Sequence, residues 1–211
     1  MQPLTTLDAV AVPLPAADID TDQILPARFM HARRDDYGRY FFHDQRFDPQ
    51  SGELRPECAL NRDGYAHARI LVTGPNFGCG SSREQAVHTL ADFGIRALVG
   101  TTFGDIFFSN CLKNGVLPVR TELAFVAHLS ALLTSDAGAR VKLDLPAQRV
   151  IAPDGKAVFF DIDAFSKEAL VGGLDEIDVT LCLAEKIDDF ERRHGVGRTP
   201  SRSGSAAPNA S

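Results

Sequence analysis

The sequence lacks the features that mark membrane, exported and nucleic-acid-binding chains. No stretch approaches the roughly 18 uninterrupted apolar residues of a membrane span, and the N-terminus lacks a basic region followed by an apolar core. Basic side chains are in the minority, 22 against 28 acidic ones, and they are mixed along the chain. We therefore expect a globular, cytoplasmic protein that binds neither membranes nor nucleic acid and whose anion sites are small and specific.

Metal and nucleotide motifs are also missing. The four cysteines, at positions 58, 79, 111 and 182, are too far apart for a C-x-x-C pair, and free thiols suit a reducing compartment. No metal cage is recognisable, so no metal is expected on this chain. Neither a G-x-G-x-x-G fingerprint nor a P-loop lysine occurs. What remains is a chain of 211 residues, 44% of them hydrophobic, which suits one large domain or two small ones.

Apolar runs bounded by turn residues alternate with amphipathic stretches. Strands are predicted over residues 7–14, 69–73, 95–99, 116–119, 140–145, 149–152 and 157–161, and helices over 82–93, 105–114, 121–133, 166–172 and 176–190. The order strand, helix, strand over residues 69–99 is a βαβ unit, which predicts a parallel pair with a right-handed crossover. A hairpin is predicted across Pro153, Asp154 and Gly155. The pattern indicates an α/β fold, and the polar tail is predicted to be disordered.

The stretch NFGCGSSREQA, residues 76–86, joins a predicted strand to a predicted helix and allows two interpretations. Ser81 and Ser82 each stand three residues before Glu or Gln, the spacing of a capping box, which predicts an ordinary helix cap. However, three glycines between residues 74 and 80 exceed what one tight turn requires, and they let backbone N–H groups approach a ligand. Arg83 adds a cation with fork geometry suited to a carboxylate. The stretch therefore also predicts a carboxylate or phosphate pocket.

Two further clusters have competing interpretations. Cys79, near a helix N-terminus, suggests a nucleophile of lowered pKa, but none of the six histidines has a recognisable cysteine-hydrolase context, which favours a small buried thiol. The aspartates of AADIDTDQILP, residues 16–26, suggest a cation site. A lone D-x-D-x-D without further oxygen ligands instead favours a loop in which Thr21 or Asp22 caps the next segment. In TTFGDIFFSNCLKNGVLP, residues 101–118, the phenylalanines are expected in the core.

Taken together, IDTDQILP, NFGCGSSREQA and FGDIFFSNCLKNGVLP, in this order and at these separations, resemble the small subunits of 3-isopropylmalate dehydratase, members of the aconitase superfamily. The segment FFDIDAFSKEALVGGLDEIDVTL resembles the same family, so the resemblance covers residues 1–193 and leaves the polar tail, 194–211, outside. It implies a three-layer β/β/α swivelling domain over 1–193, like the aconitase C-terminal domain. It further implies a large-subunit partner that carries a [4Fe-4S] cluster, with no cofactor bound by this chain.

The reaction that the resemblance implies belongs to leucine biosynthesis. Water is removed from 2-isopropylmalate and added back in the other orientation to give 3-isopropylmalate, by a hydro-lyase that is active only as the complex of both subunits. A small dicarboxylate is thus the implied substrate. A related hydro-lyase acting on another 2-hydroxy diacid, homoaconitase-like or a methylmalate dehydratase, remains the alternative within the superfamily.

The resemblance also implies roles for individual residues. Ser81 matches the serine that takes the proton from carbon, and its alkoxide must be stabilised strongly, here by the helix N-terminus and the N–H groups of Ser82 and Arg83. The Arg83 side chain would hold a substrate carboxylate, and Gly80 and Ser82 would help to bind substrate. Asp22 matches the aspartate of the T-D-x-I element, which orients the polar network near the base.

Residues 27–49 occupy the place of the family's substrate-recognition loop. Arg28, Arg33 and Arg34 can reach a second carboxylate there, or they form a solvated basic loop. Two other classes of function also stay open. The chain is either a binding module that leaves all catalysis to the large subunit, or a stand-alone cysteine enzyme that acts through Cys79. The variants Ser81→Ala and Cys79→Ser separate these classes.

Overall fold

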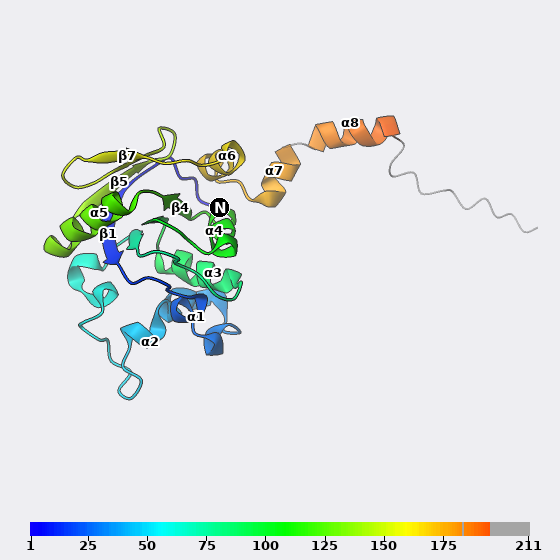
Figure 1. The fold of residues 1–211 in the computed structure, drawn as a ribbon. Helices are drawn as coiled ribbons and strands as arrows, with labels where there is room; N and C mark the ends of the chain where they lie inside the picture. Colours follow the sequence, from blue (N-terminus) through cyan, green and yellow to red (C-terminus); the bar gives the residue numbers. More distant parts are fainter. Residues whose placement is uncertain (183, 195–211) are drawn as a thin grey trace, which may run out of the picture. The chain divides into compact units, whose positions relative to one another are not determined.

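The computed structural model describes residues 1–182 and 184–194. The chain divides into two units, Met1–Asp175 and a second one that begins at Glu176 (Figure 1). The single domain predicted over 1–193 and the polar tail predicted over 194–211 stay predictions. His194 ends a helix, and residues 195–211 lie outside the described part of the chain.

Seven strands form one mixed sheet in the order β4-β3-β2-β1-β5-β6-β7. The strands are β1 (Thr6–Leu14), β2 (Ile70–Thr73), β3 (Ala97–Gly100), β4 (Leu117–Arg120), β5 (Arg140–Asp144), β6 (Arg149–Ile151) and β7 (Ala157–Phe159). β1 to β4 are parallel, and β5 to β7 continue the sheet as antiparallel strands. The predicted parallel pair of β2 and β3 and the predicted hairpin of β6 and β7 are both confirmed.

Strand β1 belongs to both parts of the sheet. Its first half pairs with β5, as far as Val10 opposite Arg140, and its second half pairs with β2, starting with Ala11 opposite Ile70. The first half alternates between exposed and buried side chains, whereas Ala11 and Val12 are both fully buried. Alternation indicates a strand with one covered face, and consecutive buried residues indicate a strand covered on both faces. The sheet therefore passes from a half-covered layer to a buried layer within β1.

Helices cover both faces of the parallel strands, and the antiparallel strands extend the sheet beyond β1 (Figure 1). The helices are α1 (Thr21–Ile24), α2 (His43–Arg46), α3 (Glu84–Phe93), α4 (Asp105–Lys113), α5 (Leu123–Ser135) and α6 (Ala164–Gly172), with 3₁₀ turns η1 (Ala27–Phe29), η2 (Arg34–Tyr40), η3 (Ala59–Asn61) and η4 (Asp63–Tyr65). Ile70 and Val72 enter a core shared with α5, α6 and β5, whereas Leu71 enters the core shared with α1, α3 and α4. The predicted three-layer α/β architecture is confirmed.

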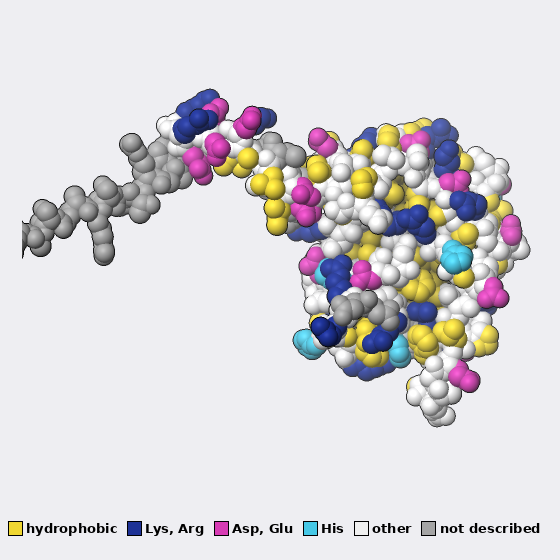
Figure 2. Space-filling view, turned by 180° about the vertical axis from the view of Figure 1, so that it is seen from behind, with side chains coloured by type: hydrophobic (Ala, Val, Ile, Leu, Met, Phe, Trp, Pro, Cys, Tyr) yellow, Lys and Arg dark blue, Asp and Glu magenta, His cyan; other side chains and the backbone are white. Residues whose placement is uncertain are grey.

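The second unit contains α7 (Glu176–Cys182) and α8 (Ala184–His194), where the sequence predicted one helical stretch over 176–190. None of the helices in the described residues has the length and apolar character needed to cross a bilayer. On the face shown in Figure 2, basic and acidic side chains are interspersed, as the mixed charge pattern of the sequence predicts.

Candidate active site

The first two sequence clusters meet just beyond the carboxyl ends of β1 and β2. Because these strands are parallel, with Leu14 opposite Thr73, the segments that follow them leave the sheet side by side. Asp18 N–H donates to Pro75 O at 2.9 Å, and Gly78 N–H donates to Ile19 O at 2.7 Å. Residues 18–21 thus run alongside residues 75–81, at the edge of a parallel sheet where ligands commonly bind.

The third cluster joins the other two through Phe77. Phe77 N–H donates to Thr102 O at 3.3 Å, and Gly104 N–H donates to Phe77 O at 3.0 Å. The Thr102 hydroxyl also accepts a bond from Asn76 N–H at 2.8 Å. Helix α4 begins at Asp105, directly after this contact. The structure therefore brings all three sequence clusters to one place.

A hollow of about 360 Å³ lies where these segments meet. Its lining residues are Thr21, Asn76, Gly78, Cys79, Gly80, Ser81, Ser82, Arg83, Gly104, Asp105, Ile106 and Phe107. The predicted base Ser81, the predicted carboxylate-binding Arg83 and two of the five predicted substrate-binding residues, Gly80 and Ser82, are among them. Asp22 joins the site through its ion pair with Arg83.

The glycine at position 78 serves packing instead of ligand approach. Gly78 has φ of +73°, and a Cβ built on it would lie 2.2 Å from Cγ of Phe107, a ring that is only 3% exposed. Its N–H group is already bonded to Ile19 O. At Gly78 the absence of a side chain therefore lets the loop cross α4, and its N–H group is used within the protein.

The predicted capping boxes at Ser81 and Ser82 are wrong. Helix α3 begins at Glu84 with Arg83 as the N-cap, and no side chain caps it. Both serines are exposed, one turn earlier in a loop. The capping box occurs instead in the aspartate cluster, where Asp20 accepts from Gln23 N–H at 2.8 Å, so Thr21 and Asp22 do not have the capping role predicted for them. The hydroxyl groups of the serine pair are thus not occupied in capping.

The loop before α3 presents unpaired donors beside a cation. Within residues 1–182 and 184–194, the N–H groups of Gly80, Ser82 and Arg83 form no hydrogen bonds. The Arg83 side chain is 16% exposed and forms an ion pair with Asp22, which is 53% exposed. A partly exposed pair of this kind contributes about 0–1 kcal/mol. A ligand carboxylate can therefore replace Asp22 at little cost and meet the N–H groups as well.

Cys79 lies in the same loop but has the wrong acidity for a nucleophile. Burial raises the pKa of its thiol, and the nearby carboxylates of Asp18 and Asp20 raise it further. A raised pKa keeps the group protonated at neutral pH, whereas a cysteine nucleophile needs a lowered one. The direction of this shift favours the small-thiol interpretation of Cys79, a partly buried group, over the stand-alone cysteine enzyme.

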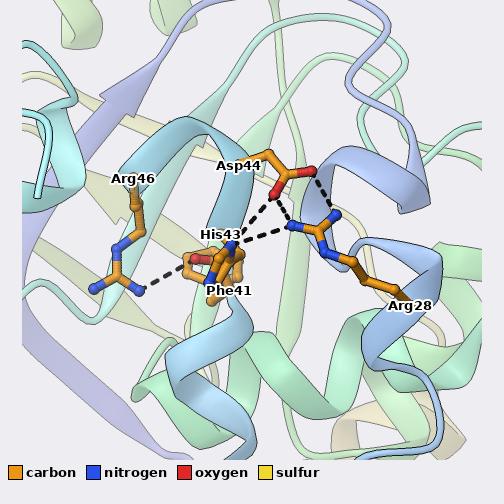
Figure 3. A network of polar contacts seen from close by, with 5 residues as sticks. All are labelled: Arg28, Phe41, His43, Asp44 and Arg46. Atoms are coloured by element: carbon orange, nitrogen blue, oxygen red, sulfur yellow. Dashed lines mark hydrogen bonds and ion pairs between the residues drawn. The ribbon is translucent and has the colours of Figure 1, made fainter. Parts of the chain in front are cut away.

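The three arginines predicted to bind substrate, Arg28, Arg33 and Arg34, do not line the hollow around Ser81. Arg28 pairs with Asp44 and approaches Nδ1 of His43 at 3.4 Å (Figure 3). The hydrogen bond from Arg28 lowers the pKa of Asp44. Arg34 lies 3.4 Å from Asp92, and Arg33 is the N-cap of η2. Their role toward a second carboxylate stays a prediction.

Several lining residues were not singled out from the sequence. Asn76 has φ of 58° and donates to Asp18 Oδ1 at 2.7 Å, and Asp18 itself has φ of 56°. Asparagine and aspartate adopt this left-handed conformation more readily than other non-glycine residues. The residue types at positions 18 and 76 were therefore the available sequence signal for this backbone conformation. Ile106, on the first turn of α4, is 55% exposed and carries no such signal.

The chain offers no donor set that fits an iron–sulfur cluster in its described part. Cys58, Cys79 and Cys111 are free thiols, and no three side chains of His, Cys, Asp or Glu in residues 1–182 and 184–194 converge on a metal site. Such clusters need several thiolate ligands held together. A cluster in this system would have to be held elsewhere than among these residues.

Comparison with known proteins identifies the family. The model of the aconitase C-terminal domain matches residues 1–123, and the model LeuD_N matches residues 127–164. The "3-isopropylmalate dehydratase small subunit" of Rhodopseudomonas palustris (strain BisA53) is 45% identical over 92% of this chain and 96% of its own length. The protein of the same name from Leptospira interrogans is 43% identical over 92% and 95%.

A solved structure supports the fold. The 3-isopropylmalate dehydratase structure from Methanocaldococcus jannaschii superposes with a TM-score of 0.62 at 22% identity and covers 89% of this chain and 99% of its own. At this identity the likeness concerns the fold alone, and it agrees with the layered architecture described above. From the family models and the full-length relatives, the chain belongs to the 3-isopropylmalate dehydratase small-subunit family of the aconitase superfamily.

Proposed function

We propose that this chain is the small subunit of a 3-isopropylmalate dehydratase and that it contributes the proton-transferring serine to an active site shared with a large subunit. The family supports the reaction and the need for a partner. The observation that carries the site assignment is the convergence of Ser81, Arg83 and Asp22 beyond the parallel strands. The free thiols of the described chain and the family's biosynthetic role support a cytoplasmic location.

In the proposed reaction Ser81 Oγ takes a proton from the carbon next to a substrate carboxylate. The electrons of the broken C–H bond form the C=C bond, and the hydroxyl leaves from the neighbouring carbon as hydroxide. Hydroxide then adds to the carbon that lost the proton, and Ser81 returns its proton to the carbon that lost the hydroxyl, so that one water is removed and one is added. A serine alkoxide is a strong base, so it needs nearby donors, and the unpaired N–H groups of Ser82 and Arg83 are suited to that task.

The Arg83 guanidinium would bind the carboxylate next to the reacting carbon. Its fork matches a carboxylate, and negative charge builds on that group as the C–H bond breaks. Asp22 is paired with the guanidinium, and it would yield part of it to the substrate carboxylate while still orienting the arginine. Gly80 and Ser82, which line the same hollow, would complete the carboxylate site.

The remaining parts of the reaction are assigned to the partner and to the arginine loop. The iron–sulfur cluster that the family implies is proposed on the large subunit, where it would act as a Lewis acid toward the departing hydroxyl. Arg28, Arg33 and Arg34 are proposed for the second carboxylate of the diacid substrate. Arg28 would have to leave Asp44 to reach it, at the small cost of breaking an exposed ion pair. Another 2-hydroxy diacid remains the alternative substrate.

The test is anaerobic turnover of 2-isopropylmalate by this chain mixed with an iron-loaded large subunit. Each subunit alone and the mixtures with Ser81→Ala and Ser130→Ala are measured in parallel, since Ser130 lies on α5 outside the hollow. Loss of the base is expected to lower kcat by about 10²–10⁴-fold, and Ser130→Ala is expected to leave it unchanged.

Three outcomes would contradict parts of the proposal. Near-normal turnover with Ser81→Ala would show that the chain is a binding module. Activity on another 2-hydroxy diacid but not on 2-isopropylmalate would change the substrate. Turnover by this chain alone would overturn the shared site.

A further inference from the structure

The hydrogen bonds between residues 19–21 and residues 78–81 end with a side-chain donor in place of a backbone N–H group. Ile19 O and Thr21 N–H bond the other segment through the backbone, as neighbouring parallel strands do, with Thr21 N–H donating to Cys79 O at 3.0 Å. Helix α1 then begins at Thr21, so the backbone turns away and no N–H group continues the ladder toward Ser81. The Thr21 hydroxyl takes its place and donates to Ser81 O at 2.8 Å. One residue thus fixes two carbonyl groups of the serine loop.

Fixing a carbonyl also fixes the N–H group of the same peptide. The peptide unit is planar and trans, so its C=O and N–H bonds point in opposite directions. With Ser81 O held toward Thr21, the N–H of Ser82 is directed to the opposite side, where it has no acceptor in the described chain. In the same way, the hydrogen bond from Thr21 N–H to Cys79 O directs the N–H group of Gly80 away from Thr21. Both groups belong to residues that line the hollow.

Thr21 is well suited to hold this geometry. It is 2% exposed, so its hydroxyl does not exchange partners with bulk water as an exposed serine would. Thr89 has the same chemistry elsewhere, since it is fully buried and its hydroxyl donates to Tyr37 O at 2.6 Å, joining α3 to η2. Thr89 does not line the hollow, which makes it a matched control for the loss of a buried hydroxyl.

We propose that Thr21 is a positioning residue that aims the Ser82 N–H group at the alkoxide of Ser81 and thereby sets the strength of the base. This role rests on the proposed function, because it concerns the same reaction. It acts through the peptide that joins Ser81 to Ser82 and requires no contact between Thr21 and the substrate. Removal of the hydroxyl therefore affects kcat, whereas substrate binding through Arg83 is retained.

The experiment compares Thr21→Val, Thr21→Ser and Thr89→Val in the reconstituted complex. Valine keeps the shape of threonine without the hydroxyl, and serine keeps the hydroxyl. Thr21→Val is expected to lower kcat by about 10–100-fold, the cost of a displaced catalytic group, with KM changed by less than about threefold. Thr21→Ser is expected to restore kcat, and Thr89→Val is expected to lower thermal stability without lowering kcat. Complex formation and far-UV circular dichroism are recorded for each variant.

A second measurement does not depend on turnover. In the isolated chain, the ¹³C resonance of the Ser81 carbonyl and the amide resonance of Ser82 should shift in Thr21→Val and stay in place in Thr89→Val. Unchanged resonances, an unchanged kcat in Thr21→Val, or an equal loss of kcat in Thr89→Val would each overturn the inference. An inactive wild-type mixture would refute the proposed function instead, and the resonances alone would then decide whether Thr21 orients the loop.

Discussion

Replacement of Gly78 by alanine tests whether this glycine is needed for packing. Its φ of +73° costs an alanine about 1–2 kcal/mol, because a Cβ crowds the carbonyl in the left-handed conformation. The new Cβ would also lie 2.2 Å from Cγ and 2.4 Å from Cδ1 of Phe107. Phe107 is 3% exposed and cannot swing into solvent, so the overlap adds about 1–3 kcal/mol. We therefore expect Gly78→Ala to lower the free energy of unfolding by about 2–5 kcal/mol.

Gly155 provides the matched control. It has φ of +88° in the hairpin between β6 and β7, and a Cβ there would meet nothing within 4 Å. Gly155→Ala should therefore show the backbone cost alone, about 1–2 kcal/mol. Unfolding in urea is best followed by far-UV circular dichroism, because the chain has no tryptophan. Equal losses in the two variants would show that the loop moves freely off Phe107 and would refute the packing argument.

Three further predictions concern charge and acidity. Cys79→Ser should keep near-normal kcat in the reconstituted complex, because burial raises the pKa of the thiol and no step uses it; loss of turnover would revive the cysteine enzyme. Arg83→Lys should lower kcat/KM for the diacid by about 10–100-fold, because an ammonium lacks the guanidinium fork; an unchanged value would remove Arg83 from the carboxylate site. Asp44→Asn should cost about 0.2–1 kcal/mol of stability at neutral pH. Arg28 lowers the pKa of Asp44 in the folded chain. The stability difference between wild type and Asp44→Asn should therefore be complete above the unfolded pKa of about 4, and it should disappear as the pH falls through the folded pKa. Urea titrations that show no such decline would refute the role of the ion pair.

The strands of the parallel layer were predictable because burial on both faces leaves consecutive apolar residues. β2, with the sequence ILVT, is buried at every position, and the predicted range differs from it by one residue. The segment between β1 and β2 was not predictable in the same way. It contains 3₁₀ turns of three residues, such as η1 and η3, which are too short to produce a periodic pattern. Tyr37 and Tyr40, which lie in η2, are nevertheless buried in the core beside α3.

The sequence was sufficient to select candidate residues for the site, but it did not predict the contacts between them. Ser81 and Arg83 stand two residues apart in a recognisable motif, so the sequence was sufficient to select them as candidates. The hydroxyl of Thr21 reaches a carbonyl 60 positions further along the chain, a contact that only the tertiary structure determines. Capping of α3 was mispredicted for a related reason, because the pairing with residues 19–21 draws the serine loop away from the helix axis and leaves Arg83 as the N-cap.

The divided pairing of β1 has a consequence for synthesis on the ribosome. The second half of β1 meets its partner once Thr73 has emerged, but Thr6 waits for Asp144. In the interval, the first half of β1 is an open sheet edge, which is prone to pair with other chains. The crossing of the three site segments and the lining of the hollow need nothing beyond Phe107. The pocket can thus take shape on a nascent chain before its central strand is protected, so a pause in translation ahead of Arg140 is the moment of greatest aggregation risk.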